Sequence, residues 1–470
     1  MTDSKNIIYI NNKKVEVTNV YHDITLLDWL RNYHKITGTK EGCAEGDCGA
    51  CSVIINKKNE EDSKPINSCL VRLGQVMGSN ITTIEGLGCD KNPHPLQMAF
   101  SNEYASQCGY CTPGFIISGV SLINSAKVVN NDTINDAISG NLCRCTGYSP
   151  IIKAIKSVSD RKTKLKKLKI INKEKKVRFG NITYLKPNNL KELKDYLEVK
   201  SFQFIAGGTD LNLQRPIINE KENNIICLIS IKELNFIKKL KEKMVLGGAV
   251  TIENFLDSVR SKMPELIEIL QRFGSPQIRN QGTIGGNLCT SSPIGDLAPL
   301  LMVLNSDINV FGKNGIKKTN IKNFFKGYRK NILKKDEIIL SIEIPYPNKK
   351  NKIFCWKLST RYDQDISTIS LAINIQTQKN IIKEIQMAAG GVAATPKSLD
   401  KLCKSMLEKK LDDAIDFATE NLDKFIQPIS DLRGSSHYRL EAMKGLFRSC
   451  LLYTSPSPRD QRGSGMPAGA

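Results

Sequence analysis

The sequence is poor in histidine and in long apolar runs, and each scarcity excludes a class of site or protein. Only four histidines occur in 470 residues, none of them close to another. A metal site built mainly from imidazoles is therefore not expected. No stretch of about 18 uncharged apolar residues is present, so no segment is expected to span a membrane. The N-terminus has neither an apolar core nor a small-residue cleavage site, and we expect a cytoplasmic chain.

Acidic residues are fewer than basic ones, so binding to nucleic acid has to be considered. Lys and Arg total 68 against 47 Asp and Glu, a net charge of +21. Between Lys156 and Arg178, eleven basic residues face two acids. A basic chain can bind phosphates, but few aromatic side chains for base stacking accompany these lysines. We therefore interpret this stretch as a solvated linker.

Cysteine, by contrast, is abundant and clustered. Nine of fourteen cysteines lie before residue 150, and eight of these nine form two tight groups. In a cytosolic chain, such clustering favours metal binding over disulfides. The first quartet, Cys43, Cys48, Cys51 and Cys69, has the spacing C-x4-C-x2-C with the fourth cysteine 17 residues later. This spacing is close to that of plant-type [2Fe–2S] proteins, and the glycines between its first three cysteines permit a tight loop.

The second quartet is less specific by itself. It pairs C-x2-C with C-x-C, separated by 31 residues, and its members are Cys108, Cys111, Cys143 and Cys145. Each pair lies near a predicted helix terminus, where unpaired N–H groups stabilise an anionic centre. Structural zinc is the alternative, although zinc pairs usually have two to four intervening residues. From spacing alone, zinc and iron–sulfur remain open here.

Hydrophobic patterning predicts several small layers. Apolar runs at 7–10 and 15–17 predict a β-hairpin around Asn11 and Asn12, and Thr25 is expected to cap a short helix with Asp28. Four helices are expected at 93–158, with starts at Pro95, Pro113, Thr133 and Ser149. After residue 177 the pattern is mixed α/β, with a helix near 402–411. The tail from 451 contains nine Pro, Ser or Gly in twenty residues and is expected to be disordered or foreign.

Glycine pairs follow strand-like runs in the second half. The string 206–210 (AGGTD) could hold a diphosphate on backbone N–H groups. It is not a G-x-G-x-x-G fingerprint, so a Rossmann site is not supported. On this evidence alone, an ordinary turn is the simpler interpretation.

Three strings resemble the molybdenum hydroxylase family: 41–51 (EGCAEGDCGAC), 107–114 (QCGYCTPG) and 140–148 (GNLCRCTGY). The resemblance implies a [2Fe–2S] cluster on each quartet and a contact from Gln107 to molybdopterin held by a partner. The strings 204–210 (FIAGGTD) and 282–287 (GTIGGN) resemble the family's FAD loops. The FAD-binding residues carried over from this resemblance are Phe204, Ile205, Ala206, Gly207, Gly208, Thr209, Asp210, Phe273, Thr283, Ile284, Gly285, Gly286, Asn287, Asp296, Leu340 and Lys357. Residues 359–367 resemble the loop near the NAD site.

The resemblance implies an α+β multidomain fold. The expected parts are a β-grasp ferredoxin domain (1–86), a helical-bundle [2Fe–2S] domain (87–158), a basic linker (159–176), a two-part FAD-binding domain (177–350), a C-terminal domain like that of the CO dehydrogenase flavoprotein (351–450) and the tail (451–470). No molybdopterin domain is expected within these residues. The order of parts resembles the small subunit of two-chain xanthine dehydrogenases.

The function implied is electron transfer from a molybdenum-binding large subunit. Electrons would pass through the second quartet, then the first, to FAD and NAD⁺, while the partner oxidises hypoxanthine and xanthine to urate. No catalytic residue is then expected on this chain, and a dimer of heterodimers is implied. Two alternatives stay open: the same role for an aldehyde- or heterocycle-oxidising enzyme, and a basic zinc protein that binds nucleic acid.

Overall fold

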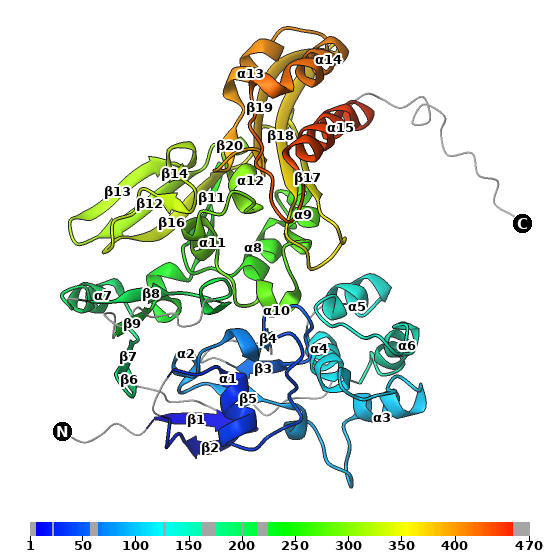
Figure 1. Cartoon of the computed structure of the whole chain (residues 1–470), viewed down its shortest axis with the longest axis vertical. Helices are drawn as coiled ribbons and strands as arrows, with labels where there is room; N and C mark the ends of the chain where they lie inside the picture. The colour runs from blue at the N-terminus through cyan, green and yellow to red at the C-terminus, as the bar shows by residue number, and fades with distance from the viewer. Residues whose placement is uncertain are drawn as a thin grey trace, which may run out of the picture. The chain divides into compact units, whose positions relative to one another are not determined.

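The computed structural model describes residues 6–20, 23–56, 64–125, 128–161, 175–199, 201–213 and 224–454 (Figure 1). Two compact units are present. The first comprises Met1–Phe236, Gly247–Ser258 and Leu270–Gly286, and the second comprises Ile237–Leu246, Val259–Ile269 and Asn287–Ala470. Both mix helices with sheets, which confirms the expected α+β class. Most of the expected basic linker and most of the expected tail lie outside the described residues.

The first sheet of unit 1 has five strands in the order β2-β1-β5-β3-β4. Their bounds are β1 (Ile7–Ile10), β2 (Lys13–Glu16), β3 (Ser52–Asn56), β4 (Lys64–Asn67) and β5 (Asn80–Thr82). The expected hairpin is confirmed, since Asn11 and Asn12 turn the chain with φ of 52° and 67°. Thr25 caps the short helix α1 (Leu26–Asp28) by accepting a hydrogen bond from the Asp28 N–H, also as expected.

Four helices follow, as expected: α3 (Pro95–Asn102), α4 (Thr112–Asn124), α5 (Asn131–Ile138) and α6 (Ser149–Ser157). Their apolar faces meet in one core, which includes Phe115 and Ile151. One of the expected helix starts is wrong. Helix α5 begins three residues early, because Asn130 is the cap and Thr133 bonds back to it. Helix α6 begins at Ser149 as expected, and Tyr148, whose φ of 69° turns the chain, is its cap residue.

The rest of unit 1 adds a four-stranded sheet in the order β6-β7-β9-β8. The strands are β6 (Lys176–Phe179), β7 (Ile182–Leu185), β8 (Gln203–Ile205) and β9 (Asn224–Cys227), with α7 (Leu190–Tyr196) after β7. This sheet shares an apolar core with the first one. Tyr184 lies so close to Gly74 that a Cβ there would be 2.2 Å from its ring. Gly74 belongs to the short helix α2 (Leu73–Val76), so the second sheet packs tightly on this helix.

Three short helices of unit 1 come from the later segments of the chain. Helix α8 (Ile252–Val259) lies mostly in this unit, α10 (Pro276–Arg279) follows Ser275, and α11 (Ile284–Thr290) begins in it. Ser275 caps α10 through its hydroxyl, which accepts a hydrogen bond from the Ile278 N–H at 3.2 Å. Helix α10 thus comes from the second half of the sequence but belongs to the unit that contains both cysteine quartets.

Unit 2 contains two further sheets, in the orders β10-β11-β16-β12-β13 and β17-β18-β19-β20. The first consists of β10 (Ile237–Lys239), β11 (Lys243–Gly247), β12 (Asp307–Gly312), β13 (Gly315–Asn320) and β16 (Ile338–Pro345). The second consists of β17 (Lys352–Leu358), β18 (Ile369–Gln378), β19 (Ile381–Gly390) and β20 (Lys397–Ser398). Helices α12 (Leu297–Val303), α13 (Asp400–Met406), α14 (Leu411–Asn421) and α15 (Ser436–Thr454) accompany these sheets.

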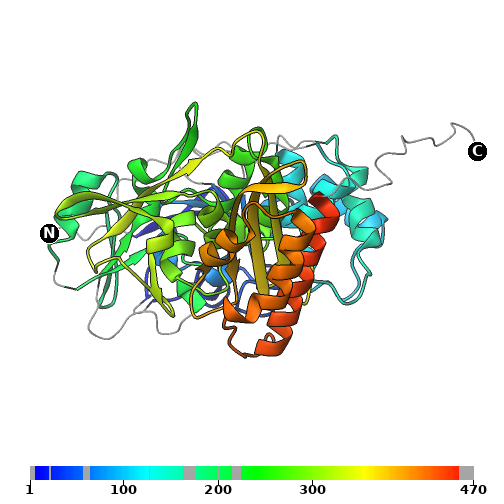
Figure 2. The same ribbon diagram turned by 90° about the horizontal axis from the view of Figure 1, so that it is seen from above.

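Helix α15 runs beside the long strands of the second sheet, where it contacts β18 (Figure 2). It extends four residues past the expected domain end at 450. The single helix expected near 402–411 is two helices, because the chain leaves the helix at Leu407 and Glu408 has a φ of 61°. Among the described residues, no helix combines the length and the hydropathy that crossing a bilayer requires.

Candidate functional site

The first cysteine quartet lies at one end of the five-stranded sheet. Cys43 and Cys48 belong to the loop before β3, Cys51 directly precedes this strand, and Cys69 lies in the 3-10 turn Ser68–Leu70 after β4. The Sγ atoms of Cys51 and Cys69 are 3.3 Å apart. A Cβ on Gly42 would lie 2.6 Å from the Cys48 Sγ, so glycine is required where the loop folds over its own thiols.

Backbone N–H groups converge on one sulfur of this quartet. The Cys43 Sγ accepts from the amides of Glu45, Asp47 and Cys48 at 3.5, 3.2 and 3.3 Å. The hydrogen bond from the Cys48 thiol, with these amides, lowers the pKa of Cys43 to about 5. In the other pair, the thiols of Cys51 and Cys69 share a hydrogen bond, and this bond lowers the pKa of Cys51. Each pair therefore favours one thiolate, the form that ligates metals.

The second quartet lies between helix termini. Cys111 is the cap residue of α4 and follows Cys108, while Cys143 and Cys145 precede α6. The Sγ atoms of Cys108 and Cys145 are 3.6 Å apart. Cys111 hydrogen-bonds to Cys143, and burial raises the pKa of Cys111 to about 12. The four thiols thus come together from segments more than thirty residues apart in the sequence.

The Cys143 sulfur has donors of its own. The backbone N–H and the hydroxyl of Thr146 lie 3.4 and 3.2 Å from it. The Tyr148 hydroxyl accepts from the Cys143 N–H at 3.0 Å. Gln107, the expected molybdopterin contact, is exposed beside Cys108. Its role stays a prediction.

Both quartets group their thiols two and two. The pairs are Cys43 with Cys48, Cys51 with Cys69, Cys108 with Cys145, and Cys111 with Cys143. Within the described ranges, no three His, Cys, Asp or Glu side chains are placed to hold a single metal ion. A [2Fe–2S] cluster has two irons, each with two protein ligands, and paired thiols fit this requirement.

The two glycine loops lie against each other in unit 1. A Cβ on Gly207 would be 2.0 Å from the Gln281 carbonyl oxygen, and one on Gly282 would be 3.3 Å from the Thr209 Oγ1. Gly208 has a φ of +77°, which favours glycine. A Cβ on Gly285 would meet the Gly248 carbonyl oxygen at 2.5 Å. Side chains are thus excluded where the loops meet, which leaves backbone N–H groups free of Cβ cover.

The loop residues divide into anchors and accessible positions. Ile205, Thr283 and Ile284 are buried, so only their backbone could contact a ligand. Asp210 is exposed, and Phe204 is half-buried against Phe202, with ring centroids 5.1 Å apart. Of the remaining expected FAD residues of unit 1, two glycines are buried, Gly207 and Gly285, and the others are half-buried: Ala206, Gly208, Thr209, Gly286 and Phe273. Accessible backbone and half-buried side chains fit a flavin diphosphate cradle, and the individual contacts stay predictions.

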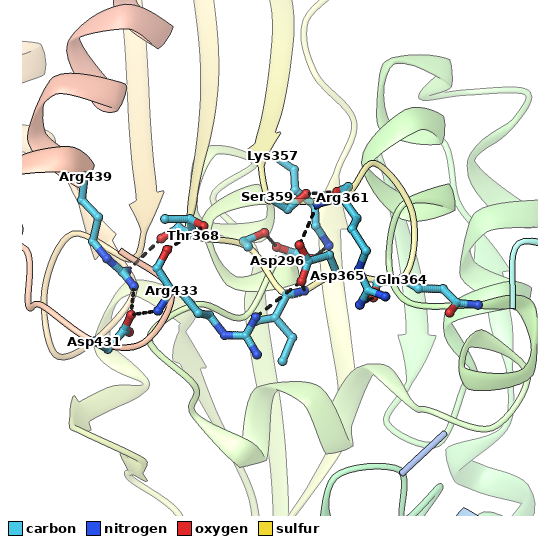
Figure 3. A network of polar contacts seen from close by, with 12 residues as sticks. Asp296, Lys357, Ser359, Arg361, Gln364, Asp365, Thr368, Asp431, Arg433 and Arg439 are labelled. Carbon is cyan, nitrogen blue, oxygen red and sulfur yellow. Dashed lines mark hydrogen bonds and ion pairs between the residues drawn. The ribbon is translucent and has the colours of Figure 1, made fainter. Parts of the chain in front are cut away.

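In unit 2, the structure brings two of the expected FAD residues together as a buried ion pair (Figure 3). The Lys357 Nζ lies 2.8 Å from Asp296, and both side chains are nearly inaccessible. The Ser367 hydroxyl also donates to Asp296. Asn287 lies beside the same turn, with its Oδ1 3.7 Å from a Cβ built on Gly295. Leu340, in β16, is half-buried, and no hydrogen bond connects it with this group.

The segment 359–367, expected near NAD, forms a folded loop beside this pair (Figure 3). Asp365 accepts from the Arg361 N–H at 2.9 Å, and the Arg433 guanidinium lies 3.4 Å from it. Burial would raise the pKa of Asp365, but hydrogen bonds from backbone N–H groups outweigh it and lower the pKa. Arg439, on α15, joins Asp431 to the Thr368 carbonyl at 2.6 and 2.8 Å. The loop is therefore tied to the C-terminal helix.

Sequence reasoning missed three groups. Ser367 bonds the carboxylate of Asp296, Thr146 bonds a ligand sulfur, and residues 277–281 connect several parts of unit 1. The string QIRNQ just before the second glycine loop was a signal, because its four polar residues need partners in a buried turn. Thr146 and Ser367 carry no comparable mark in the sequence.

Comparison with known families accounts for almost the whole described chain. Residues 8–74 match the 2Fe-2S iron-sulfur cluster binding domain, and residues 83–156 match the [2Fe-2S] binding domain. Residues 177–347 match the FAD binding domain in molybdopterin dehydrogenase. Residues 354–454 match the CO dehydrogenase flavoprotein C-terminal domain. Two [2Fe–2S] clusters and FAD are the cofactors of these domains.

Curated relatives agree with this order of domains. The chain is 28% identical to xanthine dehydrogenase of Drosophila subobscura, over 86% of this chain and 36% of that protein. It is 28% identical to xanthine dehydrogenase/oxidase of Rattus norvegicus, over 85% and 36%. It is 29% identical to aldehyde oxidase 1 of Bos taurus, over 86% and 36%. The chain thus spans little more than a third of these relatives' length.

Solved structures share the fold of somewhat more than half of this chain. A carbon monoxide dehydrogenase chain from Hydrogenophaga pseudoflava superposes with a TM-score of 0.54 and 24% identity, covering 57% of this chain and 95% of that one. Quinoline 2-oxidoreductase from Pseudomonas putida 86 gives 0.51 and 22%, covering 57% and 95%. With four consecutive domain matches and both thiol quartets assembled, the chain is the iron–sulfur and FAD-binding part of a molybdenum hydroxylase.

Proposed function

We propose that this chain is the electron-transfer subunit of a xanthine dehydrogenase. In this role it passes electrons from a molybdenum centre on a partner chain through two [2Fe–2S] clusters to FAD and on to NAD⁺, while the partner oxidises hypoxanthine and xanthine to urate. The observation that carries the proposal is the pair of thiol quartets, each grouped two and two, in one unit with interlocked glycine loops. When bound, the clusters and the flavin supply the redox chemistry.

The residues of this chain hold and tune these groups. The eight cysteines ligate as thiolates, and N–H donors from the loop after Cys43 stabilise negative charge on its sulfur. The glycine loops offer backbone N–H groups to a diphosphate. Asp296, held by Lys357 and Ser367, would accept hydrogen bonds from flavin hydroxyls. No general base for hydroxylation is needed here, because that reaction belongs to the partner.

The substrate assignment rests on the relatives alone. The similarity to xanthine dehydrogenase of Drosophila subobscura and to aldehyde oxidase 1 of Bos taurus is nearly equal, at 28 and 29% identity. An aldehyde- or heterocycle-oxidising partner is therefore the alternative. The proposed complex is a dimer of heterodimers with NAD⁺ as the acceptor.

Cofactor content tests the electron-transfer role first. The chain is purified without oxygen and analysed for iron, sulfide, flavin and zinc, together with its visible absorption spectrum. We expect about four irons, about four sulfides and one FAD per chain. A colourless protein with two zinc ions would refute the role and would support the zinc alternative.

Substrate and acceptor are tested in the complex with the molybdenum-binding chain. Urate formation from xanthine with NAD⁺ is compared with oxidation of an aldehyde and of an N-heterocycle. We expect xanthine with NAD⁺ to be fastest, and the isolated chain to be inactive. Faster aldehyde turnover would keep the electron-transfer role and replace xanthine dehydrogenase by its alternative.

A further inference from the structure

Helix α10 carries one side chain that touches both quartet-bearing regions. Gln277 is fully buried. Its Nε2 lies 3.2 Å from the Ser52 Oγ, 3.2 Å from the Ser118 Oγ and 3.1 Å from the Asn141 Oδ1. Ser52 directly follows the ligand Cys51, and Asn141 comes two residues before the ligand Cys143. One amide therefore bridges the two ligand loops.

The two loops also bond to each other directly. The Leu142 N–H donates to the Cys48 carbonyl at 3.0 Å, and the Asn141 Nδ2 donates to the Gly49 carbonyl at 3.1 Å. A Cβ on Gly49 would be 2.1 Å from the Gly140 carbonyl oxygen. The backbone just after Cys48 therefore lies directly against the backbone just before Cys143. This close contact requires glycine at position 49.

Gln277 also packs against the backbone where the two ligand loops meet. A Cβ on Gly140 would be 1.9 Å from the Gln277 Oε1, so helix α10 lies in close contact with the second ligand loop. The next residue, Ile278, packs on Cys51, Cys69 and Leu70. The side chain of Arg279 is buried, and its guanidinium lies 2.8 Å from Asp136 on α5. Consecutive residues of α10 thus hold the first quartet and the helical bundle.

We propose that Gln277, with Asn141, is a positioning residue that sets the separation of the two [2Fe–2S] clusters. The inference rests on the proposed function, since it presumes a cluster on each quartet. Electron transfer slows steeply as the distance between two centres grows. A site whose supporting residues are not held in place is displaced by about 1 Å. A buried amide with three partners is costly to leave unpaired, so its bonds define one arrangement of the two loops. Gln277 touches neither substrate nor cofactor.

The test compares Gln277→Met with Gln386→Met, a half-buried glutamine of β19 in unit 2. Both substitutions keep the volume and remove the amide. Iron, sulfide and flavin are measured first, and the fully reduced protein is then examined by electron paramagnetic resonance. We expect the wild-type spectrum to show two cluster signals with mutual magnetic splitting. In Gln277→Met, both signals remain and the splitting is lost or reduced.

Amide hydrogen exchange gives a second readout that needs no cluster signal. In Gln277→Met we expect the peptide 138–142 to exchange about tenfold faster, because its hydrogen bonds to the first ligand loop are weakened. In Gln386→Met this peptide should be unchanged. Ser118→Ala removes one of the three partners and provides a milder variant should the first fail to take up iron.

The outcomes separate this inference from the function on which it rests. Wild-type protein without iron–sulfur signals would overturn the proposed function. Full cluster content with unchanged splitting in Gln277→Met, or in Ser118→Ala where the first variant lacks iron, would overturn only the positioning role. A loss of splitting in Gln386→Met as well would also overturn the positioning role, because the effect would then not be specific to the contact between the two ligand loops.

Discussion

The two cysteine quartets differ in how far the protein covers them. In the first, Cys51 and Cys69 are buried beneath Leu27, Leu70 and Ile278. In the second, Cys108 and Cys145 are exposed, and only Cys111 and Cys143 are partly covered. Sheet, helix α10 and a glycine loop surround the first quartet, whereas the second lies between helix termini and contacts the first quartet's loop and Gln277 through residues 141 and 142.

This difference supports the direction of electron transfer proposed above. The more exposed second quartet is better placed to receive electrons from another protein, while the first quartet, with Cys51 and Cys69 buried, is better placed to pass them on within the chain. The carbonyl of Leu70, next to Cys69, accepts from Asn212 at 2.7 Å and from Gln281 at 3.2 Å. Gln281 also donates to the Gly207 carbonyl at 2.6 Å. Hydrogen bonds therefore connect the first quartet with the glycine loops that are proposed to hold the flavin.

The largest expected effect comes from removing one ligand of each quartet. Cys69→Ser and Cys145→Ser should each lose about two of four irons, because each removes one [2Fe–2S] cluster. Cys69→Ser should also lose flavin, since the turn at Leu70 supports the loop 204–210. Cys145→Ser should keep its flavin. Iron, sulfide and flavin analyses of both variants check this.

Equal flavin loss in the two variants would contradict the proposed difference between the quartets. Cys89→Ser serves as the control, because Cys89 is exposed and belongs to neither quartet. Its cofactor content should equal that of the wild type.

The next effect concerns the ion pairs that attach the bundle to α10. The Arg279 side chain is inaccessible and lies 2.7 Å from Glu253 and 2.8 Å from Asp136. Arg279→Met leaves two carboxylates without their cation, and we expect a loss of about 3–5 kcal/mol in the free energy of unfolding. Denaturant unfolding measures this. Hydrogen exchange should locate the larger change in α5, on the side of the second quartet.

Arg178→Met is the matched control, because Arg178 is exposed on β6 and its side chain donates to the Gly180 carbonyl rather than to a carboxylate. Its effect should stay within about 0.5 kcal/mol. If Arg279→Met cost no more than this, the buried pair would not hold the bundle in place.

Much of the metal chemistry was predictable from sequence, because ligands cluster in short motifs. The spacing of Cys43, Cys48 and Cys51 identified one loop, and the fold assembled it as expected. Hairpin and helix existence also followed from local patterns, as at Asn11, Asn12 and Pro95. Helix starts were less predictable. Asn130, rather than Thr133, caps α5, because several polar residues compete for one position.

Contacts between distant segments could not be predicted. Nothing local shows that Gln277 bonds Ser52 and Asn141, or that Asp136 faces Arg279 rather than capping its own helix. These contacts depend on how the sheets and helices pack, which periodicity does not encode. The flavin contacts expected at Phe273 and Leu340 came from resemblance alone and stay predictions.

A pH-dependent effect distinguishes the quartets in the metal-free chain. The pKa of Cys43 is lowered to about 5, and that of Cys111 is raised to about 12. At pH 7, Cys43 is a thiolate and Cys111 a thiol, so we expect alkylation of Cys43 to be more than about tenfold faster. Mass spectrometry of the alkylated peptides measures both rates. Denaturation in urea should remove the difference.

The same shift has a consequence for stability. Because the folded pKa of Cys43 lies below its ordinary value of 9.0, the unfolded metal-free chain binds more protons between these values. The stabilisation from Cys43 is present above about pH 9 and is lost as the pH falls towards about 5. Equal alkylation rates of Cys43 and Cys111 in the folded chain would refute the shifted pKa values.

The smallest expected effect concerns the hydrogen bond between the Thr146 hydroxyl and the sulfur of Cys143. The Cys43 sulfur accepts from the backbone N–H groups of residues 45, 47 and 48, whereas the Cys143 sulfur also has the Thr146 hydroxyl 3.2 Å away. A hydrogen bond to a ligand sulfur stabilises the reduced cluster, so Thr146→Val should lower the potential of the second cluster by about 20–60 mV. The first cluster should not change. Redox titration followed by electron paramagnetic resonance resolves both potentials. Thr112→Val is the control, since the hydroxyl of Thr112 is hydrogen-bonded to that of Ser106 at 2.8 Å. An equal shift in both variants would show that the potential responds to packing near α4 and α6 rather than to the bond at Cys143.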